Sequence, residues 1–188
     1  MKYLLWISLL FASVAHSNPQ QTQELRFKHG EAPRVGIPGG ALNLTDHNGR
    51  KFSLQSNLSA KWTLVFFGFT RCTAICPTAL LTARQVLSSE KVAPVRVLFV
   101  TLDPLSDQPA DLAKYLKHFD ARIVGLTGTP EQIEDAARRY GVATSGGGSA
   151  LEHSGRWYLL STDNRIVRTY RNNTPVDALV QDLMPASL

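Results

Sequence analysis

The chain has 188 residues, of which 44% are hydrophobic and 19% charged. This length supports one ordinary domain with a substantial core, and the composition argues against a disordered chain. Two cysteines are too few for a disulfide scaffold or for a four-cysteine zinc or iron–sulfur site. The formal net charge is +5, but the basic residues are scattered and form no stripe. This pattern argues against a nucleic-acid partner and is compatible with docking to an acidic protein or a membrane surface.

Residues 1–17 predict export. A positive charge at Lys2 precedes the apolar stretch Leu4–Ala15, which has the length of the apolar region of a signal peptide and is shorter than the ~20 residues that span a bilayer. Ala15 and Ser17 are spaced as at a signal-peptidase site, so cleavage is expected after Ser17. We therefore predict an exported, periplasmic protein. An uncleaved N-terminal helix or membrane anchor is the alternative.

Residues 18–40 are polar and proline-containing, which predicts an N-terminal arm in front of a domain of residues 41–188. The domain begins with an alternating pattern around Asn48-Gly49, typical of a β-hairpin. Two continuous apolar runs, Trp62–Phe69 and Val95–Leu102, predict buried strands. Apolar residues at helical spacing lie between them, so the segment is expected to form a βαβ unit with parallel strands.

The rest of the chain completes an α/β pattern. Helical spacing, caps and turn residues alternate with short apolar runs, which predicts a central mixed sheet with helices on both faces. The expected elements are helices over Pro109–Phe119, Pro130–Tyr140 and Pro175–Met184, a short strand at Ile123–Leu126, and a hairpin over Arg156–Tyr170 around Asp163-Asn164.

Cys72 and Cys76 follow a predicted buried strand at the point where a helix begins. Pro77 favours the first helical turn, which places Cys76 near the N-terminus of the helix and Cys72 in the turn before it. Free backbone N–H groups and the helix dipole favour a thiolate there. Outside the cytosol such a pair is a disulfide, a redox couple or a metal site. A passive disulfide would stabilise little, because the loop it closes is very short.

The spacing of the cysteines bears on their chemistry. Thioredoxin-type motifs have two residues between the cysteines, whereas three separate Cys72 and Cys76. Two thiolates select soft ions, Cu(I) first and Zn(II) second, while Cu(II) also needs nitrogen. His153 is the candidate nitrogen ligand, because it lies between the glycine-rich segment 145–149 and the predicted strand that starts at Arg156. If that strand joins the sheet, the imidazole can reach the cysteines; the glycines could equally form a plain connector.

Asp103 is a secondary candidate. It ends the second buried strand, at the edge of the sheet that carries the cysteines. A carboxylate there could orient a ligand, tune the pKa of a thiol or add a weak oxygen contact. The alternative is that Asp103-Pro104 only forms a turn.

The segment Phe67–Thr78 (FGFTRCTAICPT) resembles the cysteine motif of the SCO/SenC family of copper chaperones. The similarity continues in Thr101–Pro104 with Asp107 after it, and in Glu152–Ser154 before the last predicted hairpin. Thr73 departs from the family pattern, since many members have proline there. The cleavable N-terminal segment is a second departure, since many members remain anchored in a membrane.

The resemblance implies a thioredoxin-like fold with a β-hairpin, and a copper site made by Cys72, Cys76 and His153. It also implies delivery of Cu(I) or Cu(II) to the copper A subunit of cytochrome c oxidase, or to another copper-accepting protein. The alternative is a thiol–disulfide oxidoreductase that reduces the cysteines of the receiving site and needs only the two thiols. Thioredoxins and peroxiredoxins usually place a proline in the loop before the corresponding strand, and none lies between Val142 and Tyr158.

Overall fold

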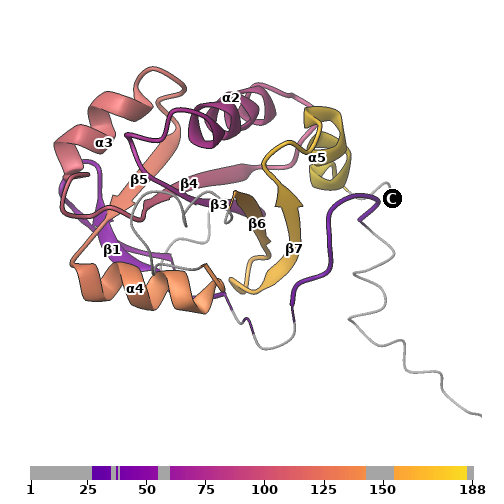
Figure 1. Cartoon of the computed structure of the whole chain (residues 1–188). Coiled ribbons are helices and arrows are strands. Elements are labelled where there is room, and N and C mark those ends of the chain that lie inside the picture. The colour runs from indigo at the N-terminus through magenta and orange to yellow at the C-terminus, as the bar shows by residue number, and fades with distance from the viewer. Residues whose placement is uncertain (1–26, 35–36, 38, 55–59, 143–154, 186–188) are drawn as a thin grey trace, which may run out of the picture.

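A fully buried strand, β3 (Trp62–Gly68), runs through the middle of a mixed sheet (Figure 1). The structure is a computed structural model that describes residues 27–34, 37, 39–54, 60–142 and 155–185. Within these residues the sheet has 7 strands in the order β2-β1-β5-β4-β3-β6-β7. β4 (Val95–Thr101) pairs parallel to β3 on one side and β6 (Arg156–Leu160) antiparallel on the other. Because β3 has a neighbour on each side, its carboxyl end is held in a fixed frame.

The predicted βαβ unit and both predicted hairpins are present. Helix α2 connects β3 to the parallel strand β4, and β4 pairs in turn with the parallel strand β5. At one edge, the hairpin of β1 and β2 contains Gly49 with φ +77°, the left-handed conformation that such a turn requires. The other hairpin joins β6 to β7. The bounds are β1 (Asn43–Asp46), β2 (Lys51–Ser53), β5 (Ile123–Thr127), β7 (Ile166–Arg171) and α2 (Ile75–Leu87).

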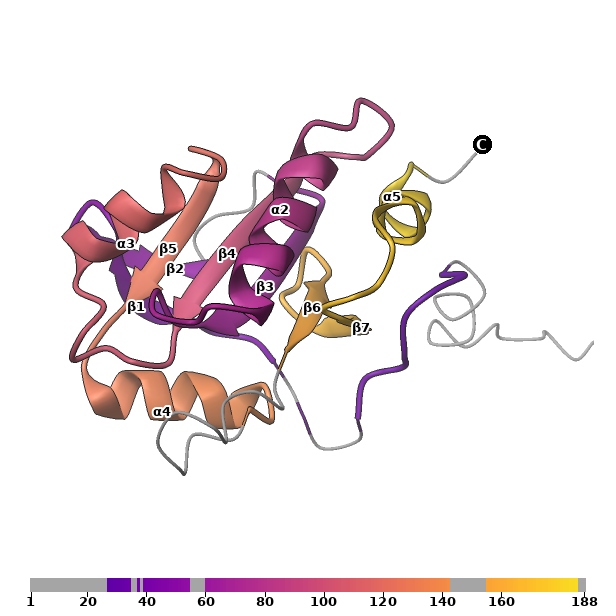
Figure 2. The same cartoon turned by 45° about the horizontal axis from the view of Figure 1, so that its top comes forward.

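Side-chain alternation in β3 assigns each face of the sheet to a different core (Figures 1 and 2). Leu64 and Phe66 belong to the cluster beneath helices α2, α3 and α5. Val65 and Phe67 point to the opposite face and pack in the cluster beneath α4. Helices therefore cover both faces, as predicted. The remaining helices are α3 (Pro109–Leu116), α4 (Pro130–Arg139) and α5 (Val176–Leu183).

The described part of the predicted N-terminal arm is packed against the C-terminal elements. Phe27 is buried, and its ring meets Trp62 edge-on at 5.7 Å between centroids. The backbone N–H groups of Lys28 and His29 donate to the buried carboxylate of Asp182 in α5, the former at 2.8 Å. Glu31 then pairs with β7 through an isolated bridge. Residues 1–26 lie outside the described residues, and no helix within the described part of the chain has the length and hydrophobicity to span a bilayer.

Candidate metal centre

Cys72 and Cys76 lie at the carboxyl end of β3. The strand ends at Gly68, and a turn closes when the N–H of Cys72 donates to the carbonyl of Phe69 at 3.2 Å. α2 begins at Ile75, so Cys76 occupies its first turn and Cys72 the turn before it. Both placements are as the sequence predicts.

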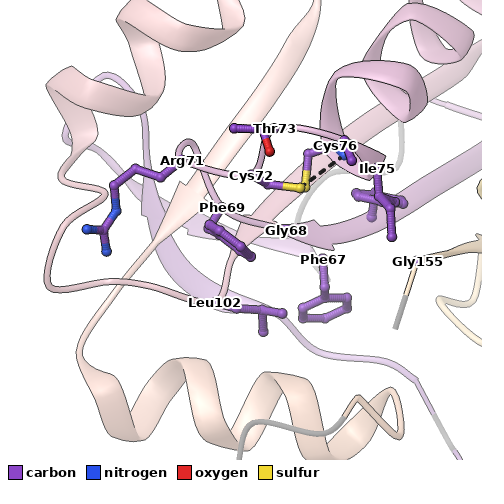
Figure 3. Close-up of a pocket in the computed structure, with 12 residues that line it drawn as sticks. Phe67, Gly68, Phe69, Arg71, Cys72, Thr73, Ile75, Cys76, Leu102 and Gly155 are labelled. Carbon is purple, nitrogen blue, oxygen red and sulfur yellow. Dashed lines mark hydrogen bonds between the residues drawn. The ribbon is translucent and has the colours of Figure 1, made fainter. Parts of the chain in front are cut away.

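The two cysteines are in direct contact. The backbone N–H of Cys76 donates to the sulfur of Cys72 at 3.3 Å (Figure 3). Ala74, the N-cap residue of α2, makes no side-chain capping bond, so the Cys72 sulfur satisfies an N–H that a capping oxygen would otherwise accept. Both residues are free thiols. The structure therefore holds the pair in its reduced form.

The two thiols differ in acidity. Burial raises the pKa of Cys72, but hydrogen bonds from the Cys76 side chain and from the N–H groups at the start of α2 outweigh burial and leave that pKa lowered. Burial raises the pKa of Cys76, and the hydrogen bond to Cys72 raises it further. Cys76 is only 3% exposed, whereas Cys72 is partly exposed. Cys72 is therefore the more accessible and more nucleophilic thiol.

A pocket of about 240 Å³ opens beside the sulfurs, with an apolar floor formed by Phe67, Phe69 and Leu102 (Figure 3). Gly68 allows Cys76 to pack on the end of β3, since a Cβ built on this glycine would lie 2.7 Å from the Cys76 sulfur. Gly155 also packs closely on the cysteine motif, since a Cβ there would lie 2.9 Å from Cγ2 of Ile75. Gly155, the residue immediately before β6, thus lies at the rim of the cysteine pocket.

His153 lies outside the described residues, so the structure does not place its imidazole. The strand predicted after it, β6, joins the sheet directly beside β3, and the role of His153 as a ligand stays a prediction. Gly155, two residues further along the chain, lines the pocket. Among the described residues, no three His, Cys, Asp or Glu side chains converge in an arrangement that could hold a metal ion.

Asp103 lies at the same edge of the sheet, in the turn after β4. Its carboxylate forms an ion pair with Arg71 and accepts a bond from the N–H of Ser106 at 3.4 Å. Burial raises the pKa of Asp103, but its bonds to Arg71 and Ser106 prevail and lower it. Arg71 points away from the sulfurs (Figure 3). These contacts fit a turn-forming residue, and the metal-related role of Asp103 stays a prediction.

Asp107 is the residue near the site that sequence reasoning did not single out. Its carboxylate is fully buried and accepts hydrogen bonds from Thr70 and Thr101. The one sequence signal that could have found Asp107 is the family resemblance, because Asp107 follows Thr101–Pro104 within the segment that carries it. Nothing in the local pattern distinguishes it from a solvated aspartate in front of a helix.

Comparisons with known proteins identify the family. Residues 32–186 match the family model described as SCO1/SenC. The mitochondrial SCO2 homolog of Bos taurus is 33% identical over 175 residues, which cover 88% of this chain and 63% of the bovine protein. The chain thus spans about three fifths of that relative's length.

Solved structures agree with this assignment. Copper-bound yeast Sco1 superposes with a TM-score of 0.66 at 31% identity, covering 78% of this chain and 90% of that one. BsSco, described as a member of the Sco family of cytochrome c oxidase assembly proteins with a disulfide switch, gives a TM-score of 0.66 at 25% identity and covers 82% and 95% of the two chains. The thioredoxin-like fold is thereby confirmed, and the chain belongs to the SCO1/SenC family.

Proposed function

We propose that this chain binds copper through Cys72, Cys76 and His153 and passes it to the copper A centre of cytochrome c oxidase or to another copper enzyme. The observation that carries the proposal is the pair of free thiols held in contact at the end of β3, beside an open pocket. Copper bound to yeast Sco1, and the membership of BsSco in a family of oxidase assembly proteins, support it.

The donor set fits copper. Two thiolates suit Cu(I), and an added imidazole would extend the site to Cu(II). One chain residue spans at most ~3.6 Å, so His153 lies no more than about 7 Å along the chain from Gly155 at the pocket rim. The cysteine pair and His153 come from separate segments of the chain. An acceptor protein could therefore replace these ligands one at a time, as transfer of copper requires.

Loading requires reduced thiols, because a Cys72–Cys76 disulfide has no thiolate to offer Cu(I). We place the protein in the periplasm on the strength of residues 1–17, with a peripheral contact to the membrane where its acceptor resides. Mass determination of the N-terminus of the exported protein tests cleavage after Ser17. An uncleaved N-terminus in the membrane fraction would instead mean an anchored protein.

The decisive experiment is a competition titration of the reduced protein with Cu(I) and Cu(II). Cys72→Ser and Cys76→Ser are expected to abolish tight Cu(I) binding. His153→Ala is expected to weaken copper binding, most severely for Cu(II), while far-ultraviolet circular dichroism stays unchanged. His118→Ala is the matched control, since His118 lies just after α3. Parent-like affinity of His153→Ala for both oxidation states would refute the three-ligand site.

A second function, reduction of a disulfide in the copper-receiving protein, is favoured by the inequality of the thiols. A partly exposed Cys72 with a lowered pKa suits attack on a disulfide, and buried Cys76 suits resolution of the mixed disulfide. His153 is dispensable for that reaction. Disulfide reductase turnover that survives His153→Ala, in a protein that binds copper only weakly, would favour this function over copper transfer.

A further inference from the structure

A buried carboxylate supports the turn that carries Cys72. The Asp107 side chain is fully buried, and within the described residues no basic side chain forms an ion pair with it. A buried carboxylate is costly unless its oxygens are hydrogen-bonded. Here three donors satisfy it: two come from the turn after β3, and one comes from the last residue of β4.

The three donor groups belong to two threonines, Thr70 and Thr101. The N–H of Thr70 donates to Oδ2 at 3.0 Å, and the Thr70 hydroxyl donates to Oδ1 at 2.5 Å. The Thr101 hydroxyl donates to Oδ2 at 2.6 Å and accepts the N–H of Asp103 at 2.9 Å. Asp107 therefore joins the turn after β3 to the last residue of β4, and its own N–H bonds back to the carbonyl of Asp103 at 2.8 Å.

Thr70 connects Asp107 to the turn that leads to Cys72. It is a central residue of the turn that closes between Phe69 and Cys72, so its N–H and its hydroxyl fix how that turn leaves the strand. The other central residue, Arg71, is bound by Asp103 of the same loop. The loop after β4 thus holds both central residues of the turn, and the Cys72 sulfur then lies against the N–H of Cys76.

We propose that Asp107 is a positioning residue: it holds the Phe69–Cys72 turn against β4 and so sets the placement of the Cys72 sulfur relative to Cys76. It touches neither sulfur in the contacts described, and although its charge contributes to the raised pKa of Cys76, the positioning role is exerted through Thr70. The copper part of this inference rests on the proposed function, whereas the placement of the thiols is a property of the metal-free protein.

Two variants separate position from charge. Asp107→Ala removes every acceptor and leaves Thr70 and Thr101 with unpaired donors. Asp107→Asn keeps the shape of the side chain. Its carbonyl oxygen can accept both hydrogen bonds that Oδ2 of Asp107 accepts. Its NH₂ group can donate to the oxygen of the Thr70 hydroxyl, because a hydroxyl can accept as well as donate. A positioning role predicts that Asn rescues what Ala loses.

Asp182→Ala is the matched control. Asp182 is also a buried carboxylate with three groups donating to it, namely Lys28 N–H, His29 N–H and the Tyr170 hydroxyl, but these hold the arm against α5 and β7. Asp182→Ala should lower the thermal midpoint of unfolding, as Asp107→Ala should, but it should leave the alkylation rate of Cys72 and the Cu(I) affinity unchanged. Thr70→Val provides a milder test that removes only the hydroxyl bond, should Asp107→Ala fail to fold.

Two measurements decide the proposal: the iodoacetamide alkylation rate of Cys72 without metal, and Cu(I) affinity by competition. Asp107→Ala is expected to change the alkylation rate and to weaken Cu(I) binding about 10–100-fold, the range for loss of a group that orients a ligand. Asp182→Ala should match the parent in both, and Asp107→Asn should keep the alkylation rate of the parent and bind Cu(I) no more weakly than the parent.

Parent-like alkylation in both Asp107→Ala and Thr70→Val would overturn the proposal, as would equal effects of Asp107→Ala and Asp182→Ala. An Asn variant as impaired as Ala would overturn it too, because charge rather than position would then be responsible. A parent protein that fails to bind Cu(I) would refute the proposed function, while the alkylation rates would still decide the role of Asp107.

Discussion

At the scale of single residues, Gly68 makes the thiol site possible. Any side chain there would occupy the space of the Cys76 sulfur and of the Phe99 ring, since a Cβ would lie 2.7 Å from the one and 2.9 Å from the other. We expect Gly68→Ala to cost about 1–3 kcal/mol of stability through overpacking and to displace Cys76. Denaturant titration and Cu(I) competition measure the two effects.

Gly125 in β5 provides the control for this steric argument. A Cβ there would lie 2.7 Å from Cδ1 of Leu116, so Gly125→Ala should destabilise the fold in the same way. It should leave copper binding unchanged, because α3 rather than a cysteine takes the strain. Equal copper affinity of the two alanine variants would contradict the special role of Gly68.

The unequal thiols give a second prediction at this scale. In the reduced protein, iodoacetamide should modify Cys72 well before Cys76, because Cys72 is more exposed and its lowered pKa leaves more thiolate at neutral pH. The rate at Cys72 should rise with pH, and the midpoint of that rise should lie below the usual pKa of a thiol. Peptide mapping by mass spectrometry distinguishes the sites, and earlier labelling of Cys76 would contradict the prediction.

At the scale of elements, the carboxylate of Asp182 holds residues 27–31, which we call the N-terminal strap, against helix α5. Asp182 accepts the N–H groups of Lys28 and His29 and the hydroxyl of Tyr170. Asp182→Ala should cost about 1–3 kcal/mol, since buried donors lose their acceptor. The amide hydrogens of residues 28 and 29 should exchange faster in this variant than in the parent, whereas the exchange rates of the β3 amides should stay as slow as in the parent.

Asp177→Ala, on the exposed face of the same helix, should change stability by less than about 1 kcal/mol, the range for a charge in the first helical turn. If the two aspartate variants are equally stable, Asp182 does not hold the strap.

At the scale of the whole molecule, the proposed function predicts that copper stabilises the native state, because the turn and helix that bring Cys72 and Cys76 together exist only in the folded chain. Binding adds about 2.7 kcal/mol when free Cu(I) is 100 times the dissociation constant. The thermal midpoint of the reduced protein should therefore rise with Cu(I), and that of Cys72→Ser should not. An equal rise in both would place the metal elsewhere.

Much of this architecture follows from pattern. Apolar runs such as Trp62–Phe69 and turn dipeptides such as Asn48-Gly49 predict strands and hairpins directly, and the ends differ from the structure by only a few residues. The helix expected over Pro109–Phe119, for example, ends at Leu116. The placement of Cys72 and Cys76 was also predictable, because Pro77 marks the first turn of a helix that follows a buried strand.

The supporting contacts were not predictable. Asp107 lies in a polar stretch of the sequence and Asp182 lies among apolar residues of a helix, and the contacts that bury them involve partners 37 and 154 positions away, respectively. The polar, proline-containing composition of residues 18–40 likewise hides the burial of Phe27. Periodicity reports which face an element buries, whereas these contacts arise from how distant elements pack.

The bond between the Cys76 amide and the Cys72 sulfur makes the backbone itself an indicator of occupancy. A cation or a second sulfur that engages Cys72 draws electron density from the atom this amide faces, so the amide resonance of residue 76 must move. A nuclear magnetic resonance spectrum of isotopically labelled protein would thus distinguish reduced, oxidised and loaded molecules in one mixture, with no dye or reporter group attached.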